Sequence, residues 1–295
     1  TADQISTAFY KLACNYGVST GSEQSYVYLN GLASEFEEAV QLFEHLLQNA
    51  VADEGKLKQM VAQKLKSRKD AKLNKGAIMG RLRNYALYGQ ENPSTYFLSE
   101  KELMGIGGEE LTTYIHNLGN YKHKVFYSGP LTIERLDGIL SKLHTIPDEY
   151  LPTPSLKEFE MRDADGKSVY LAHYDMVQAE IMWLKKSTEL ALSESADIDM
   201  FNEYFGGGMS SIVFQEIREA KALAYSTYSF YSEASKLGDN NVVLAYVGTQ
   251  SDKMKDGMEA MNILLADLPK DQKTFDNGKQ ALKQNLETSR ILKTS

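Results

Sequence analysis

The sequence FNEYFGGGMSSIVFQEIREAKALAYSTYSFY, residues 201–231, changes its pattern three times within one short stretch. Residues 201–205 end a run of helical character that begins near Ser193. Gly206–Gly208 follow directly, and three glycines in a row remove every Cβ constraint on φ. The pattern therefore predicts that a helix ends at the glycines and that the chain turns sharply there.

A second helix and then a strand are predicted after the glycines. Residues 210–211 are both serine, a good N-cap type, and residues 212–219 place apolar side chains at helical spacing. Residues 223–231 alternate with a period of two and are rich in tyrosine, which is typical of a strand. A helix end that carries Arg218 is thus followed by a strand start that carries Tyr225.

This string resembles the signature of the C-terminal domain in the pitrilysin/insulysin-type zinc metallopeptidases, the inverzincin class, which includes the mitochondrial processing peptidases and non-catalytic relatives. The matching parts are the loop of small residues at 206–211, the helix that contains Phe214 and Ile217, and the order of Arg218 and Tyr225. The resemblance is strong for residues 165–291 and looser for residues 1–145. It implies an α+β fold with two similar domains, each a mixed or antiparallel sheet with helices mainly on one face.

Composition excludes several other classes of protein. The 295 residues carry a net charge of −8 with a pI near 5.3, and no basic stripe offsets this acidity, which argues against nucleic acid as the main partner. The single cysteine, Cys14, forbids an intrachain disulfide. No apolar run is long enough for a membrane span. These features leave the cytoplasm, the periplasm and an organelle all open as compartments.

Periodicity predicts the remaining elements. Helices are expected at residues 1–16, 34–47 with Ser34 as N-cap, 53–73, 75–88, 107–117, 132–144, 252–266 and 269–291. Strands are expected at residues 25–32, 124–128, 168–174, 179–185 and 242–247.

A proline-containing stretch predicts the domain boundary. Pro147, Pro152 and Pro154 lie close together among polar residues, so residues 146–164 are expected to form a stiff linker. We expect a first, degenerate peptidase-like domain at residues 1–145 that lacks its opening strands. A C-terminal peptidase-like domain at residues 165–295 is expected to lack its closing elements. The resemblance thus implies a fragment of a longer parent, with both domains truncated.

No metal site is predicted in this chain. An inverted zinc motif needs two histidines one helical turn apart, and none of the five histidines has that spacing. Glu44-His45 resembles the end of such a motif, but Gln41 occupies the position of the first ligand, so His45 is expected on a helix surface. Residues 58–65, where catalytic members carry the third ligand, contain no glutamate.

Arg218 and Tyr225 are the predicted substrate-binding residues, because the matching pair in the family binds the peptide opposite the zinc. The guanidinium donates to a substrate carbonyl, and the phenol hydrogen-bonds the peptide or the oxyanion. The alternative is that Arg218 pairs with a neighbouring glutamate and that Tyr225 only packs. Gly206, Gly207 and Gly208 are predicted to line the peptide entrance, and they are equally compatible with a tight joint between helices.

The resemblance implies that the parent is a zinc metalloendopeptidase that hydrolyses peptides in a closed chamber. This chain is expected to be its non-catalytic, substrate-binding half, inactive alone and without a catalytic residue of its own. Zinc is expected outside this fragment, on an N-terminal half or a partner subunit, and the other partner is the peptide substrate. Two alternatives are a catalytically inactive relative used for structure or assembly, and a binding module unrelated to proteolysis.

Overall fold

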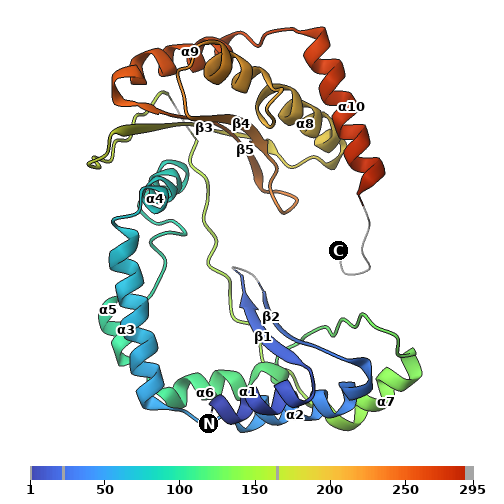
Figure 1. Cartoon of the computed structure of the whole chain (residues 1–295). Coiled ribbons are helices and arrows are strands. Elements are labelled where there is room, and N and C mark those ends of the chain that lie inside the picture. Colours follow the sequence, from blue (N-terminus) through green and yellow to red (C-terminus); the bar gives the residue numbers. More distant parts are fainter. Residues whose placement is uncertain (1, 22–23, 164–165, 290–295) are drawn as a thin grey trace. The chain divides into compact units, whose positions relative to one another are not determined.

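A computed structural model of the chain describes residues 2–21, 24–163 and 166–289. These residues form two compact units (Figure 1). The first unit contains residues 2–68 and 98–158, and the second contains residues 69–97 and 159–289. The fold is mixed, with small antiparallel sheets and many helices.

The first unit combines one two-stranded ribbon with helices. The strands are β1 (Asn15–Thr20) and β2 (Ser25–Asn30), which pair antiparallel. The helices are α1 (Ala2–Lys11), α2 (Phe36–Asn49), α3 (Glu54–Ala71, whose last turn belongs to the second unit), α5 (Glu100–Gly105), α6 (Gly108–His116) and α7 (Ile133–Leu143). Short 3₁₀ turns lie at η1 (Ala33–Glu35) and η2 (Leu118–Asn120).

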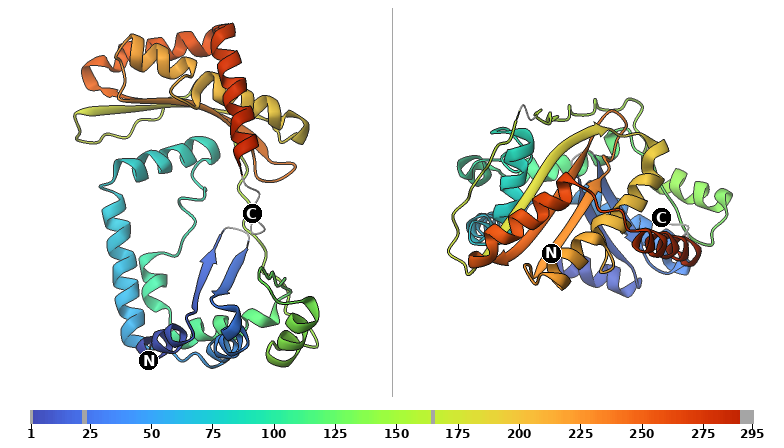
Figure 2. Two further views of the ribbon diagram at one scale, coloured as in Figure 1. Left: turned by 45° about the vertical axis from the view of Figure 1, so that its right-hand side comes forward. Right: turned by 90° about the horizontal axis from the view of Figure 1, so that it is seen from above.

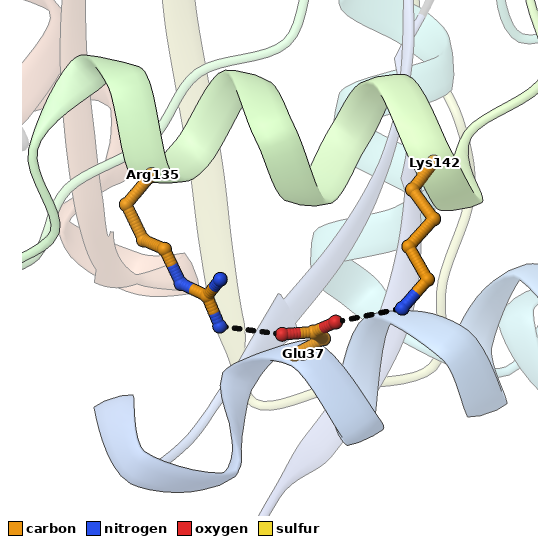
Figure 3. A network of polar contacts seen from close by, with 3 residues as sticks. All are labelled: Glu37, Arg135 and Lys142. Carbon is orange, nitrogen blue, oxygen red and sulfur yellow. Dashed lines mark hydrogen bonds and ion pairs between the residues drawn. The ribbon is translucent and has the colours of Figure 1, made fainter.

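A small core and a pair of ionic contacts hold these helices together. Phe9 of α1 packs with Ala39 and Phe43 of α2. Glu37 of α2 receives two bonds from α7, at 2.6 Å from Arg135 and at 3.1 Å from Lys142 (Figure 3). The hydrogen bond and charge of Lys142, together with the charge of Arg135, lower the pKa of Glu37. The carboxylate therefore links α2 to α7 while it is ionised.

The second unit is a three-stranded antiparallel sheet with helices on both faces. The strand order is β3 (Gln178–Glu189), β5 (Asn240–Gln250) and β4 (Ser226–Ser232). Helices α8 (Ser195–Phe201), α9 (Met254–Ala266) and α10 (Gln272–Thr288) lie on one face, and α4 (Lys75–Tyr88) lies on the other (Figures 1 and 2). Two π-helices, η4 (Asn202–Gly206) and η5 (Phe214–Ala220), complete the helical layer, with 3₁₀ turns at η3 (Leu192–Glu194) and η6 (Ser251–Lys253).

The main core of this unit lies between the sheet and that helical layer. Ala245 and Val247 of β5 are buried in one cluster with Met261 of α9. Phe205 of η4 and Ile217 of η5 are fully buried in the same cluster. Because successive strand residues point to opposite faces, Tyr246 and its neighbours on β3 and β4 point toward the side of α4.

Most of the predicted helices are confirmed. The helix predicted at residues 75–88 has the predicted bounds, and the other predicted helices, except the one at residues 1–16, are present with shifted ends. Residues 290–291 of the helix predicted at 269–291 lie outside the described residues. The Asp53 carboxylate accepts a hydrogen bond from the Lys56 backbone at 2.9 Å, which fixes the start of α3. The strands predicted at residues 25–32, 179–185 and 242–247 are confirmed as β2, β3 and β5.

Two predictions about the N-terminal region are wrong. Residues 1–16 are not one helix, because α1 ends at Lys11 and Ala13 turns the backbone with a φ of 47°. Asn15 then begins β1, which pairs with β2. Ser34 is not the N-cap of α2 either; it lies inside the 3₁₀ turn η1, and the N-cap position is held by Glu35.

The strands predicted at residues 124–128 and 168–174 are also wrong. Neither segment pairs with another strand among the residues that the structure describes. Val169 and Leu171 are about nine-tenths exposed, at 92% and 90%, because no sheet lies beside them. The segment at residues 168–174 is held by a side chain instead, since Tyr170 packs on Tyr85 of α4. A strand pattern without a pairing partner remains an extended segment.

Candidate functional site

The three glycines occupy three different environments. Gly206 ends η4 in the core, and a Cβ added there would lie 2.2 Å from the Ser229 backbone oxygen of β4. A Cβ on Gly207 would lie 2.8 Å from the Asn202 carbonyl oxygen, whereas on Gly208 the nearest atom is a side-chain oxygen at 3.5 Å. Gly206 therefore allows close approach of a helix and a strand, and only Gly207 and Gly208 lie nearer the surface.

Asn202 fixes this helix end to the edge of the sheet. Its side-chain nitrogen donates to the Tyr231 carbonyl at 3.0 Å, and its side-chain oxygen accepts from the Tyr231 backbone N–H at 2.7 Å. The amide thus satisfies both backbone groups of one residue on the outer strand β4. The position of the glycine loop relative to β4 is set by this pair.

Arg218 lies on the π-helix η5, one residue after the fully buried Ile217. Its side chain is 46% exposed, its guanidinium carbon lies 4.9 Å from the centre of the Phe214 ring, and its Nε lies 3.8 Å from the Glu219 carboxylate. A contact at that distance with both side chains about half exposed is weak. The helix is therefore fixed by its buried side, and the guanidinium keeps donors available.

The turn between η5 and β4 is tightly hydrogen-bonded. Ala222 has a φ of 49°, in the left-handed region that favours glycine. Its backbone N–H donates to the Arg218 carbonyl at 3.1 Å, and its own carbonyl accepts from Lys253 Nζ at 3.1 Å. The buried Thr249 hydroxyl donates to the Leu223 carbonyl at 2.5 Å. The turn that separates Arg218 from Tyr225 is thus held at several points.

Tyr225 lines a small pocket at the end of β5. Tyr225 is 53% exposed, and its phenol oxygen accepts a hydrogen bond from Gln250 Nε2 at 2.6 Å. The pocket has a volume of about 180 Å³ and is lined by Ala222, Leu223, Ala224, Tyr225, Gln250 and Lys253. Arg218 is not among these lining residues. The two predicted residues therefore do not line one pocket, although they lie at the two ends of one turn.

A tyrosine pair lies on the sheet face opposite α9. Tyr228 and Tyr246 stack with ring centres 4.8 Å apart, on strands β4 and β5. Burial, together with the nearby Glu180 carboxylate and Tyr228, raises the pKa of Tyr246 to about 12, and burial also raises the pKa of Tyr228. Both phenols are therefore neutral hydrogen-bonding groups at neutral pH.

Glu180 is held beside this pair by a residue of α4. Lys75 Nζ lies 2.8 Å from the Glu180 carboxylate, whose side chain is only 12% exposed. The same Nζ donates to the Gln178 side chain at 3.3 Å. We call the surface formed by Glu180, Tyr228, Phe230, Tyr246 and Gln250 the aromatic face. It combines flat apolar rings with neutral hydroxyls and one paired carboxylate, which suits contact with polypeptide.

The comparisons with known proteins connect these features. The Peptidase M16 inactive domain family matches residues 123–282, which is more than half of the chain. The chain belongs to this family. The M16 match includes the glycine loop, Arg218 and Tyr225, and it confirms the resemblance read from the residues 201–231.

Relatives of the M16 chain include two bacterial proteins. An uncharacterized zinc protease of Bacillus subtilis, YmxG, is 26% identical over 304 residues, covering 97% of this chain and 69% of the relative. An uncharacterized zinc protease of Rickettsia felis is 25% identical over 278 residues, covering 86% of this chain. This chain spans 61% of the length of the Rickettsia protein.

Solved structures share the M16 fold at lower sequence identity. The peptidase M16 inactive domain of Pseudomonas fluorescens has a TM-score of 0.69 at 18% identity, with 97% of this chain and 69% of that chain covered. The ferredoxin protease FusC, in complex with Arabidopsis ferredoxin, has a TM-score of 0.73 at 11% identity, with 98% of this chain and 32% of that chain covered.

The described part of the M16 chain does not fit a catalytic zinc ion. It contains no group of three or more histidine, cysteine, aspartate or glutamate side chains that could hold a metal ion. His45 is exposed on α2, as predicted, and its ring bonds to Asn49 at 3.1 Å.

No described helix is long and apolar enough to cross a membrane.

Several residues of this region were not predicted from the sequence. Gln250, which binds the Tyr225 hydroxyl, and Asn202, which binds the edge of β4, carry no sequence pattern that marks them. Glu180 and Lys75 are 105 residues apart and meet only because α4 lies on the sheet. The alternation of β4 places Tyr228 and Phe230 on the aromatic face, opposite the buried Ser229.

Proposed function

We propose that this chain is the non-catalytic, substrate-binding half of a zinc-dependent metalloendopeptidase that hydrolyses peptides in a closed chamber. Arg218 and Tyr225 are the proposed peptide-binding residues. Gly206, Gly207 and Gly208 form the proposed loop at the peptide entrance, with Gly206 acting as the buried spacer that positions the other two. Catalytic zinc is proposed to bind to polypeptide other than the residues described here.

One observation carries the proposal: the side chains of Arg218 and Tyr225 are about half exposed, although the backbone that carries each of them is held by packing or by a hydrogen bond to the sheet. The side chain of Arg218 is 46% exposed although the adjacent Ile217 is fully buried, and Tyr225 is 53% exposed although its backbone N–H bonds to β5 at 2.8 Å. Because the backbone that carries these groups is already ordered, binding a ligand does not require the chain itself to be ordered. A guanidinium then offers donors to peptide carbonyls, and the phenol offers both a donor and an acceptor.

The aromatic face supplies a second contact surface for a peptide. Gln250 belongs to it and bonds directly to the Tyr225 hydroxyl, so the predicted binding residue contacts the edge of the aromatic face. Stacked neutral tyrosines bind polypeptide backbone and side chains without a strong charge preference. The similarity to FusC, whose structure contains a bound protein, ferredoxin, agrees with a polypeptide ligand.

The domain arrangement is part of the same proposal. Residues 1–145 and 165–295 would be two similar peptidase-like domains joined by a linker at 146–164, both of them incomplete within this chain. The first unit has a sheet of only two strands, and a lone pair of strands has little stability without further packing. The relatives named zinc proteases are longer than this chain, which agrees with a zinc-bearing half or partner subunit elsewhere.

The test is a substitution in the complete protein. Arg218→Ala removes charge-assisted hydrogen bonds to the substrate, which are worth about 1.5–3 kcal/mol, so kcat/KM for a peptide should fall about 10- to 100-fold. Zinc content should not change. Lys255→Ala is the matched control, because Lys255 is an exposed cation of the same unit and lies on α9.

Three outcomes contradict parts of the proposal. Unchanged kinetics in Arg218→Ala would remove that residue from substrate binding. An equal loss in Lys255→Ala would point to a general charge effect instead of a specific contact. A complete protein that holds no zinc and cleaves no peptide would favour the alternative function, a catalytically inactive relative that serves in structure or assembly.

A further inference from the structure

Two histidines far apart in sequence meet in the first unit. His123 follows η2, and His144 is the C-cap residue of α7. Their Nε2 atoms lie 2.9 Å apart, and the ring planes are nearly perpendicular at 89°. Neither residue belongs to the region of Arg218 and Tyr225, and no use for them follows from the proposed function.

The other nitrogen of each ring is already bound to an acceptor. His144 Nδ1 lies 2.7 Å from the Glu44 carboxylate of α2, and both side chains are only 16% exposed. His123 Nδ1 lies 2.7 Å from the Tyr121 carbonyl oxygen. A carbonyl oxygen and an ionised carboxylate accept hydrogen bonds, so both Nδ1 atoms must donate.

Counting protons then shows what must lie between the rings. A neutral imidazole carries one N–H, and in each ring the Nδ1 donor uses it. Both Nε2 atoms would then present lone pairs to each other at 2.9 Å, which is repulsive. A positive charge between them removes the repulsion, and that charge is either one additional proton or a metal cation.

We propose that His123 and His144 form a binding site for a divalent transition metal of the zinc and copper type. Neutral imidazole nitrogen is a preferred ligand of both ions. Two nitrogens that bind one tetrahedral Zn²⁺ at the usual bond length lie about 3.3 Å apart, so the rings need to separate by only about 0.4 Å.

The surroundings of the two rings match those of metal-binding histidines. Such histidines donate the second ring N–H to a carboxylate or a backbone carbonyl, which are the roles of Glu44 and Tyr121 here. His144 also ends α7, and the C-terminal end of a helix attracts positive charge. Three features thus favour a cation at this position: the facing lone pairs, the outer acceptors and the helix end.

The site has two protein ligands, since the described residues contain no larger group of metal-binding side chains. Water completes the coordination in this proposal, and His123 is exposed enough to admit it.

The experiment uses the tag-free chain and Zn²⁺ alone. Titration calorimetry should show saturable binding of one ion, and His123→Gln or His144→Gln should each abolish it, because glutamine keeps a hydrogen-bonding side chain but is a poor zinc ligand. Glu44→Gln should weaken binding about 10- to 100-fold, since it removes the acceptor that orients His144. His45→Ala is the control, because His45 neighbours Glu44 and its ring bonds to Asn49 instead.

A second readout identifies the ligands directly. With Cu²⁺, electron paramagnetic resonance should show splitting from two imidazole nitrogens in the unaltered chain and should lose that pattern in His123→Gln. Circular dichroism of each variant checks that the fold is kept. Absence of saturable binding would overturn the proposal and leave a shared proton between the rings. If His123→Gln and His144→Gln bind Zn²⁺ as tightly as the control His45→Ala does, the proposed site at His123 and His144 is overturned.

Discussion

Substitution of Gly206 by alanine tests how the glycine loop is built. The new Cβ would lie 2.2 Å from the oxygen and 2.4 Å from the nitrogen of the Ser229 backbone. Backbone atoms in a paired strand cannot move aside as a flexible side chain does, so η4 or β4 must shift. Overpacking of a core costs about 1–3 kcal/mol, and a clash with backbone belongs at the upper end of that range. We expect a loss of about 3 kcal/mol in the free energy of unfolding.

The neighbouring glycines give a graded control series. Gly207→Ala places its Cβ 2.8 Å from the Asn202 carbonyl oxygen and should have an intermediate effect. Gly208→Ala meets two side-chain oxygens at ordinary contact distance, that of Glu203 at 3.5 Å and that of Ser210 at 4.0 Å, and should change stability by less than about 0.5 kcal/mol. The order of destabilisation should therefore be Gly206, then Gly207, then Gly208.

Thermal unfolding measures this series with one probe. The chain has a single tryptophan, Trp183 of β3, so its fluorescence reports the unit that contains the glycines. A loss of about 3 kcal/mol lowers the Tm of a unit of this size by about 6–12 °C. Equal Tm values for Gly206→Ala and Gly208→Ala would refute the reasoning, because they would show that the approach to Ser229 does not limit packing.

Three further predictions concern backbone strain and pH. Ala222→Gly should raise stability by about 0.5–1 kcal/mol, since it removes the cost of a positive φ, and a lower Tm by Trp183 fluorescence would contradict this. Because the pKa of Glu37 is lowered in the folded chain, the stability that its carboxylate contributes is present above pH about 4.5 and is lost as pH falls through the folded pKa. Glu37→Gln should therefore have a lower Tm than the unaltered chain at pH 7, and this difference in Tm, measured by circular dichroism, should close in acid. Because the pKa of Tyr246 is raised to about 12, the stability contributed by its neutral phenol is fully present below pH about 10 and is lost as pH rises toward 12. The urea midpoint of Tyr246→Phe should therefore fall less steeply at alkaline pH than that of the unaltered chain.

Local patterns in the sequence predicted helices well, because helical hydrogen bonds join residues four apart. Residues 75–88 show this, since α4 has the predicted bounds. Strands depend on partners that are distant in sequence, and this is where the errors lie. Residues 168–174 have a strand pattern but no pairing partner in the described chain, whereas Asn15–Thr20 lacks a strong pattern and becomes β1 because β2 lies beside it.

The candidate site was predictable only where a family signature marked it. Arg218 and Tyr225 lie in such a string, and the M16 match contains both. Their partners follow from the register of the sheet: Gln250 reaches Tyr225 only because β5 pairs with β4. His123 and His144 lie outside any motif spacing, since a helix and its preceding turn separate them, and helical i, i+4 spacing was the criterion that set histidines aside.

The position of the proposed binding residues is determined by packing on the far side of the elements that carry them. Gly206 brings η4 against Ser229, Ile217 anchors η5 in the same core, and the turn at Ala222 connects that helix to Tyr225. A change in the core can therefore move Arg218 without touching it. Gly206→Ala should thus weaken peptide binding by the complete protein together with its stability, whereas Arg218→Ala should weaken binding alone, so a comparison of the two variants separates loss of position from loss of contact.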